Sequence, residues 1–151
     1  MIEPENVDGI LQLAIEKEVE AYNFYLALAN AVEDQRIRVA FEELAKEELE
    51  HKAKLELEVM KTGKTIPVEE NPARPGRSYI VSNDPSPLDM DYKDMLMLAM
   101  EKEEAAFRIY VKLAANVHDK KSQEVLLALA EEEVKHKLRF QTEYDILLKK
   151  R

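Results

Sequence analysis

The sequence predicts an all-α fold in which two antiparallel helical hairpins, joined by a long crossover loop, form a four-helix bundle. Two long tracts, about 7–61 and 89–150, contain no proline and, from residue 10 onward, no glycine. Both are rich in Ala, Leu, Glu and Lys, which favour helices. Five of the six prolines and two of the three glycines lie between these tracts. The two tracts also resemble each other, which indicates a duplicated hairpin.

Each tract is too long for one ordinary helix, and each is interrupted by a short polar segment, at 33–35 and at 118–122. A short turn between two helices makes them antiparallel neighbours. The expected elements of a single domain, residues 1–151, are helices at 7–31, 34–61, 90–117 and 121–148 and a crossover at 62–89. A loop of this length is unusual inside a domain, but four-helix bundles with one long crossover are a known type.

The internal repeat has a constant offset of 85 residues, which is the spacing between Glu18 and Glu103. The segment LAIEKE, which ends at Glu18, matches LAMEKE, which ends at Glu103. The same offset relates Tyr25 to Tyr110 and His51 to His136. The register is therefore kept across the turn in both halves.

Ionisable residues occupy core positions in all four expected helices. A helix in a bundle has an apolar stripe that advances by three and four residues. This spacing continues through the middle of each helix only if the stripe includes charged or titratable residues, which are Glu18, Glu48, His51, Glu103, Glu133 and His136. Burying four carboxylates without compensation would be prohibitive.

Two divalent cations would neutralise these four carboxylates, and the two histidines would add neutral nitrogen ligands. In each Glu-x-x-His motif, Glu48 with His51 and Glu133 with His136, the two side chains share one helix face about one turn apart. A single motif of this kind is common on solvated helices, where pairs such as Glu47 and His51 can be exposed. The occurrence of two motifs and two further glutamates in core register favours a two-metal site.

Composition limits the classes of function and partner. The net charge of −9 disfavours binding to nucleic acid. The absence of cysteine excludes disulfides, thiolate metal sites and iron–sulfur centres on this chain. We expect no membrane span, because no apolar run approaches 18 residues, and no signal peptide at the acidic N-terminus. A cytoplasmic location is therefore expected.

The sequence resembles the rubrerythrin-like branch of the ferritin-like di-iron carboxylate proteins. The resemblance covers nearly all of the helical segments and rests on the two Glu-x-x-His motifs and on Glu-x-x-Ala-x-x-x-Tyr at 18–25 and 103–110. It implies a site for two iron ions. Glu18 and Glu103 would be terminal carboxylates, Glu48 and Glu133 bridging carboxylates, and His51 and His136 one nitrogen ligand for each metal. Tyr25 and Tyr110 would hydrogen-bond the ligand carboxylates.

Two features depart from peroxidase-type rubrerythrins. Those proteins have an additional glutamate near the third-helix ligand, whereas Ala106 and Met100 stand one turn after and before Glu103. They also usually contain a rubredoxin-like domain, which the lack of cysteine excludes from this chain. Both departures argue against the standard route of peroxide reduction and imply an external electron-transfer protein.

The leading hypothesis is a di-iron oxidoreductase that reacts with dioxygen or hydrogen peroxide. Three alternatives remain open: an iron-binding or storage protein, a bundle with metal as a structural clip, and a dimanganese catalase-like enzyme, since these ligands also suit manganese. The family resemblance further implies a homodimer, and the long crossover leaves room for hairpin exchange between chains.

Overall fold

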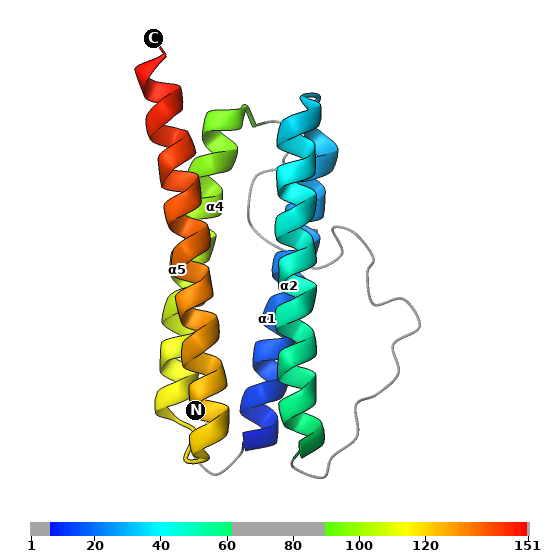
Figure 1. Ribbon diagram of the computed structural model, residues 1–151, viewed down its shortest axis with the longest axis vertical. Helices are drawn as coiled ribbons and strands as arrows, with labels where there is room; N and C mark the ends of the chain where they lie inside the picture. The colour runs from blue at the N-terminus through cyan, green and yellow to red at the C-terminus, as the bar shows by residue number, and fades with distance from the viewer. Residues whose placement is uncertain (1–6, 62–89, 151) are drawn as a thin grey trace. The chain divides into compact units, whose positions relative to one another are not determined.

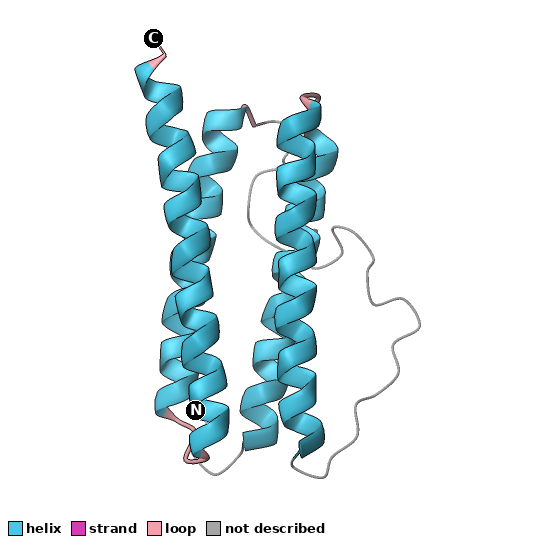
Figure 2. Cartoon of the chain, in the orientation of Figure 1, coloured by secondary structure: helices cyan, strands magenta, loops and turns pink. Residues whose placement is uncertain are grey.

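The computed structural model describes residues 7–61 and 90–150, which form four helices and no strand (Figures 1 and 2). The helices are α1 (Val7–Ala31), α2 (Gln35–Lys61), α4 (Tyr92–Ala115) and α5 (Lys120–Lys149). Their ends differ from the expected ends by at most two residues. The crossover expected at 62–89 lies outside the described residues.

The first hairpin consists of α1 and α2, which pack against each other in antiparallel directions (Figure 1). The turn between them ends at Asp34, whose Oδ1 accepts hydrogen bonds from the backbone N–H groups of Arg36, at 2.9 Å, and Ile37, at 3.4 Å. Asp34 therefore satisfies N–H groups that a helix start leaves without internal partners. On the other side of the turn, the Arg38 guanidinium donates to the Val32 carbonyl oxygen at 3.4 Å.

The second hairpin consists of α4 and α5 and repeats this construction. Asp119, 85 positions after Asp34, accepts a hydrogen bond from the Ser122 backbone N–H at 2.9 Å and begins α5. The Gln123 side chain, at the position equivalent to Arg38, donates to the Ala114 carbonyl oxygen across the turn at 3.0 Å. Asp91 caps the start of α4 in the same way, through the Asp94 N–H.

Each hairpin is a compact unit of its own, with buried apolar side chains along both of its helices. Leu11, Leu28 and Leu55 in the first hairpin, and Leu96 and Leu126 in the second, are at most 1% exposed. All five lie on the same helix faces as the predicted ligands Glu18, His51, Glu103 and Glu133, at the spacing that the sequence analysis used. The apolar spacing of three and four residues thus determined correctly which face of each helix is buried.

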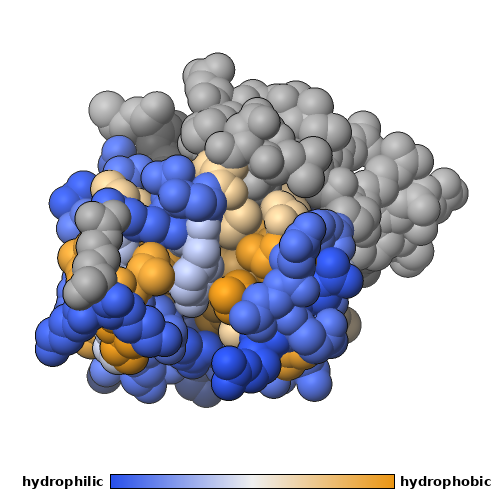
Figure 3. All heavy atoms as spheres, turned by 90° about the horizontal axis from the view of Figure 1, so that it is seen from above, coloured by the Kyte–Doolittle hydropathy of each residue, from blue (hydrophilic) through white to orange (hydrophobic). Residues whose placement is uncertain are grey.

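Hydrophilic residues gather on the outer surfaces of the helices, as the end-on view in Figure 3 shows. Among the described residues, no helix is both long enough and apolar enough to cross a membrane.

Candidate metal centre

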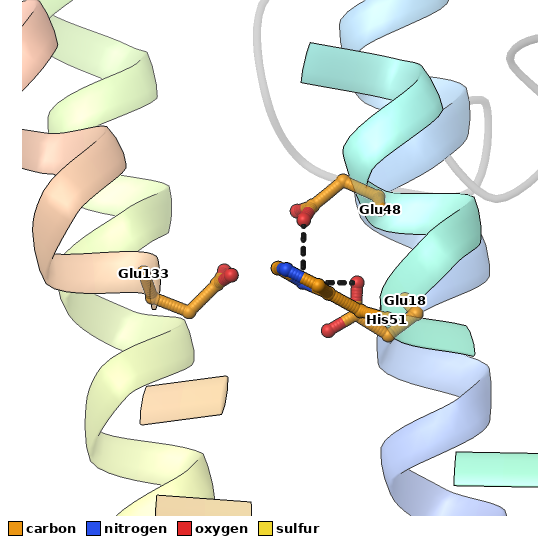
Figure 4. A group of neighbouring side chains, drawn as sticks. All are labelled: Glu18, Glu48, His51 and Glu133. Carbon is orange, nitrogen blue, oxygen red and sulfur yellow. Dashed lines mark ion pairs between the residues drawn. The ribbon is translucent and has the colours of Figure 1, made fainter. Parts of the chain in front are cut away.

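The first hairpin brings Glu18 of α1 together with Glu48 and His51 of α2 (Figure 4). The Nδ1 atom of His51 lies 3.0 Å from Oε1 of Glu48 and 3.5 Å from Oε1 of Glu18. The three residues each offer one ligand atom, and these atoms lie within 4.8 Å of one another. All three residues are buried, with at most 3% of their surface exposed.

The second hairpin brings together the equivalent residues, Glu103 of α4 with Glu133 and His136 of α5. Nδ1 of His136 lies 3.5 Å from Oε2 of Glu103 and 3.9 Å from Oε1 of Glu133. These residues are also buried, and their ligand atoms also lie within 4.8 Å of one another. Each hairpin therefore contributes two carboxylates and one imidazole, and these come from equivalent positions on equivalent helices.

Helix periodicity explains how each set is assembled. Glu48 and His51 are three residues apart on α2, so their side chains project from one face about one turn apart. Glu18 lies on the stripe of α1 that packs against this face. In both hairpins the Nδ1 atom of the histidine lies close to the carboxylates, so Nδ1 is a nitrogen that could bind a metal there.

The two tyrosines that the sequence singled out are both buried, at 1% exposure. The Tyr25 ring stacks on Phe41, with ring centroids 6.4 Å apart, and meets the edge of Phe24 at 5.1 Å. The positions equivalent to these phenylalanines are aliphatic in the second hairpin, where Ile109 and Leu126 stand. We call the two glutamates and the histidine of each hairpin a half-site. The two half-sites therefore share their polar residues but differ in the apolar surroundings of the nearby tyrosine.

The chemistry of these groups fits divalent metal ions. A buried carboxylate is costly unless a positive charge or strong hydrogen bonds compensate it. Each half-site contains two such carboxylates beside a single imidazole, which provides at most one positive charge. Carboxylate oxygen and imidazole nitrogen together are typical ligands of iron, manganese and zinc.

Sequence reasoning missed one buried charge, Glu58 on α2, which is 6% exposed. Its Oε2 lies 3.2 Å from Nζ of Lys61, one turn later. Glu58 lies three residues after Leu55, so it fits the spacing of the α2 stripe, but the apolar Val59 fits the same stripe four residues after Leu55. A Glu–Lys pair three residues apart is also common on exposed helices, so the sequence did not single out Glu58. Because Lys61 compensates its charge, Glu58 needs no metal.

Comparison with known proteins identifies the family of the chain. No curated protein sequence matches the chain. A hypothetical protein from Pyrococcus furiosus has a similar structure, with 26% sequence identity, 95% of this chain and 91% of that chain covered, and a TM-score of 0.70. The sequence model of the rubrerythrin family matches residues 9–144. The fold class expected from the sequence, a ferritin-like four-helix bundle, is thereby confirmed, and the chain belongs to the rubrerythrin family.

Proposed function

We propose that the protein is a di-iron carboxylate oxidoreductase that reacts with dioxygen or hydrogen peroxide. In this proposal the two half-sites form one centre for two iron ions. The ligands would be Glu18, Glu48, His51, Glu103, Glu133 and His136.

The observation that supports this proposal most strongly is the burial of an equivalent ligand set in both hairpins. Each set contains two carboxylates and one imidazole, and its ligand atoms lie within 4.8 Å of one another. Four carboxylates match the charge of two divalent cations. Membership of the rubrerythrin family favours iron, although the same ligands suit manganese.

The protein residues would hold the metals and exclude bulk water. The ligand carboxylates would change their binding mode as the charge of the metal ions changes. Glu18 and Glu103 would each bind one metal, and Glu48 and Glu133 would bridge both. A bound iron pair would supply electrons and Lewis acidity for cleavage of an O–O bond. The buried Tyr25 and Tyr110 hydroxyls would orient ligand carboxylates through hydrogen bonds.

Electrons would come from a separate electron-transfer protein, because the chain has no cysteine with which to hold a rubredoxin-type or iron–sulfur centre. Composition also favours a cytoplasmic setting.

Anaerobic reconstitution with ferrous iron tests the metal site directly. We expect two irons per chain by elemental analysis, and we expect the loaded protein to consume dioxygen or hydrogen peroxide when a chemical reductant is supplied. His136→Ala should lose iron and turnover together. Glu131→Ala, which removes an exposed glutamate five residues earlier on the same helix, is the matched control.

Three results would contradict the proposal in different ways. No uptake of iron would remove the metal site itself. Uptake without turnover, in a large hollow assembly, would indicate storage, and uptake without turnover in a small assembly would indicate a structural metal. Reconstitution with manganese that restores disproportionation of peroxide, where iron gives none, would indicate the catalase-like alternative.

A further inference from the structure

The two half-sites differ in one distance between their ligand atoms, although their residues are equivalent. Nδ1 of His51 lies 3.0 Å from Oε1 of Glu48 (Figure 4). Nδ1 of His136 lies 3.9 Å from Oε1 of Glu133. Two ligand atoms that bind the same metal ion at about 2.0–2.2 Å lie about 3.0–3.4 Å apart. The pair in the first hairpin therefore already has the spacing that a metal ion requires, whereas the pair in the second hairpin must move closer together.

The packing around the two tyrosines is a second difference. The Tyr25 ring contacts Phe24 and stacks on Phe41. The residues at the equivalent positions of the second hairpin, Ile109 and Leu126, are aliphatic and cannot provide these ring contacts. Ring contacts on two sides restrain Tyr25, which lowers the entropic cost of placing its hydroxyl beside a ligand carboxylate. The first half-site is therefore the better preorganised of the two.

Net charge is a third difference between the hairpins. Residues 7–61 include thirteen acidic and seven basic side chains, a net charge of −6, whereas residues 90–150 include twelve and eleven, a net charge of −1. The difference extends to the neighbours of the ligands, because Glu50 precedes the histidine of the first half-site and Lys135 precedes that of the second. Charges within about 10 Å act most strongly on a bound ion, since salt screens those farther away. The first hairpin therefore attracts a divalent cation to its own half-site more strongly.

We infer that the two metal positions are inequivalent, and that the half-site of the α1–α2 hairpin binds a divalent metal ion more tightly and fills first. The inference rests on the proposed metal centre and adds an order of loading to it. Ligand spacing, tyrosine packing and charge all favour the same half-site. We expect the two affinities to differ by about tenfold or more. The metal held by the α4–α5 hairpin is then the more readily exchanged one.

The three histidines of the chain allow a direct test. His51 and His136 each belong to one half-site, and His118 is exposed between α4 and α5, so it serves as an internal control. The probe is Zn²⁺, which suits these ligands and has no redox chemistry. In nitrogen-15 NMR of the metal-free full chain labelled at histidine, we expect the His51 ring signals to move over the first equivalent of Zn²⁺. The His136 signals should move over the second, and the His118 signals should remain in place. The variants His118→Gln and His136→Gln assign the signals.

A change of packing tests one cause of the order. Phe41→Leu gives the first hairpin the residue of the second at this position. It should lower, several-fold, the ratio of His51 occupancy to His136 occupancy at one equivalent of Zn²⁺. Both occupancies are measured in the same molecule, so a general loss of stability would not change their ratio. Phe107→Leu, the same substitution at a 37% exposed residue of α4, is the matched control and should leave the ratio unchanged.

A change of charge tests the other cause. The double variant Arg108→Asn with Lys135→Glu gives the second hairpin the residues of the first at both positions. It makes this hairpin more negative, so Zn²⁺ should bind more tightly at His136 and the two histidines should fill over a similar range. In the unsubstituted protein, high salt should reduce the difference between the two affinities, because salt screens the charges.

The matched control for charge is Lys149→Glu with Lys150→Asn, which changes the net charge by the same amount at the far end of α5. Lys149 follows His136 by 13 residues, or about 20 Å along the helix, which exceeds the screening length of about 10 Å. The ratio of occupancies should therefore remain that of the unsubstituted protein.

Different results would overturn the inference and the proposed metal centre. Movement of the His136 signals before or together with those of His51 would overturn the order of loading and leave the metal centre in place. An unchanged ratio in both Phe41→Leu and the charge variant would overturn the causes given for the order. If neither histidine responded to Zn²⁺, the metal centre itself would be excluded, and the inference with it.

Discussion

Glu133 shows how a single buried carboxylate links stability to metal binding. It is 1% exposed, and its Oε1 lies 3.9 Å from Nδ1 of His136, which is beyond hydrogen-bonding distance. The half-site buries two carboxylates, Glu103 and Glu133, and its one imidazole provides at most one positive charge. A bound cation would compensate the remaining negative charge, so the same side chain should destabilise the metal-free protein and stabilise the metal-loaded one.

We predict that Glu133→Gln raises or leaves unchanged the Tm of the metal-free protein and lowers the Tm of the iron-loaded protein. Saturating a site at about 100 times its Kd adds about 2.7 kcal/mol, which is about 5–10 °C in a domain of this size. The variant should lose most of this increment. Differential scanning calorimetry with and without iron measures both effects.

The matched control is Glu131→Gln, which changes an exposed carboxylate two residues away. It should leave both Tm values within experimental scatter. A fall in the Tm of the metal-free Glu133→Gln protein would show that this carboxylate stabilises the fold without metal, contrary to the prediction.

Asp119 allows a prediction of pH dependence. The backbone N–H of Ser122 donates a hydrogen bond to its carboxylate, which lowers the pKa of Asp119 below the ordinary value of 3.8. A group with a lowered pKa in the folded state stabilises the protein above its unfolded pKa, and this contribution is lost as pH falls through the folded pKa. We predict that Asp119→Ala lowers Tm at pH 7 and that the difference from the unsubstituted protein shrinks below about pH 3.8.

Asp119→Asn serves as the control, because an asparagine oxygen caps a helix nearly as well as aspartate and does not titrate in this range. The Tm difference between Asp119→Asn and Asp119→Ala should therefore stay constant with pH. If the difference between the unsubstituted protein and Asp119→Ala also stayed constant, the carboxylate charge would have no part in capping.

For single residues, the sequence predicts burial best for the ionisable side chains that occupy core positions in the apolar stripes. Glu18, Glu48 and His51 interrupt a strict apolar spacing, so a periodicity argument places them inside, and the structure buries them together. Glu58 is also buried, three residues after Leu55, but the apolar Val59 fits the same stripe and is the expected core residue there. Its burial depends on packing around the end of α2, which a single helix pattern does not contain.

At the scale of the helices, the difference in burial between the two faces of α2 can be tested by substitution. Leu55 is 0% exposed and Leu57 is 53% exposed, although they are two residues apart. We predict that Leu55→Ala lowers the free energy of unfolding by about 2–5 kcal/mol, because it leaves a cavity in the core. Leu57→Ala should change it by no more than about 0.5 kcal/mol. Chemical denaturation of both variants provides the measurement, and similar losses in the two would contradict the observed orientation of α2.

The bounds of the helices followed from the sequence because breakers and caps are local signals. Asp34 and Asp119 stand at the two turns, and both accept hydrogen bonds from the first residues of the following helix. The expected third helix, 90–117, was too long at both ends, since Asp91 caps α4 and Asn116 ends it. Asn116 donates to the Lys112 carbonyl oxygen, a local hydrogen bond that competes with continuation of the helix.

At the scale of the whole molecule, the repeat makes the two hairpins chemically equivalent halves. Each half has the same three candidate ligands, two glutamates and one histidine, at an offset of 85 residues, which the sequence alone reveals. The sequence does not reveal how charges and apolar residues outside the stripes are used, because a solvated helix face and an interface can have the same composition.

Equivalence of the halves leads to a test of whether the metals belong to one shared centre, as proposed, or to each hairpin separately. In a shared centre Glu48 would bridge both metals, so Glu48→Ala should weaken both, and bound iron should fall below one per chain at a concentration that saturates the unsubstituted protein. Glu133→Ala, the equivalent change in the other hairpin, should have the same effect. Glu50→Ala, which removes an exposed glutamate of α2, is the control.

Retention of one iron with undiminished affinity in Glu48→Ala would show that the α4–α5 hairpin binds its metal independently. Isothermal titration of the metal-free protein with ferrous iron under anaerobic conditions distinguishes these results, because it reports stoichiometry and affinity together.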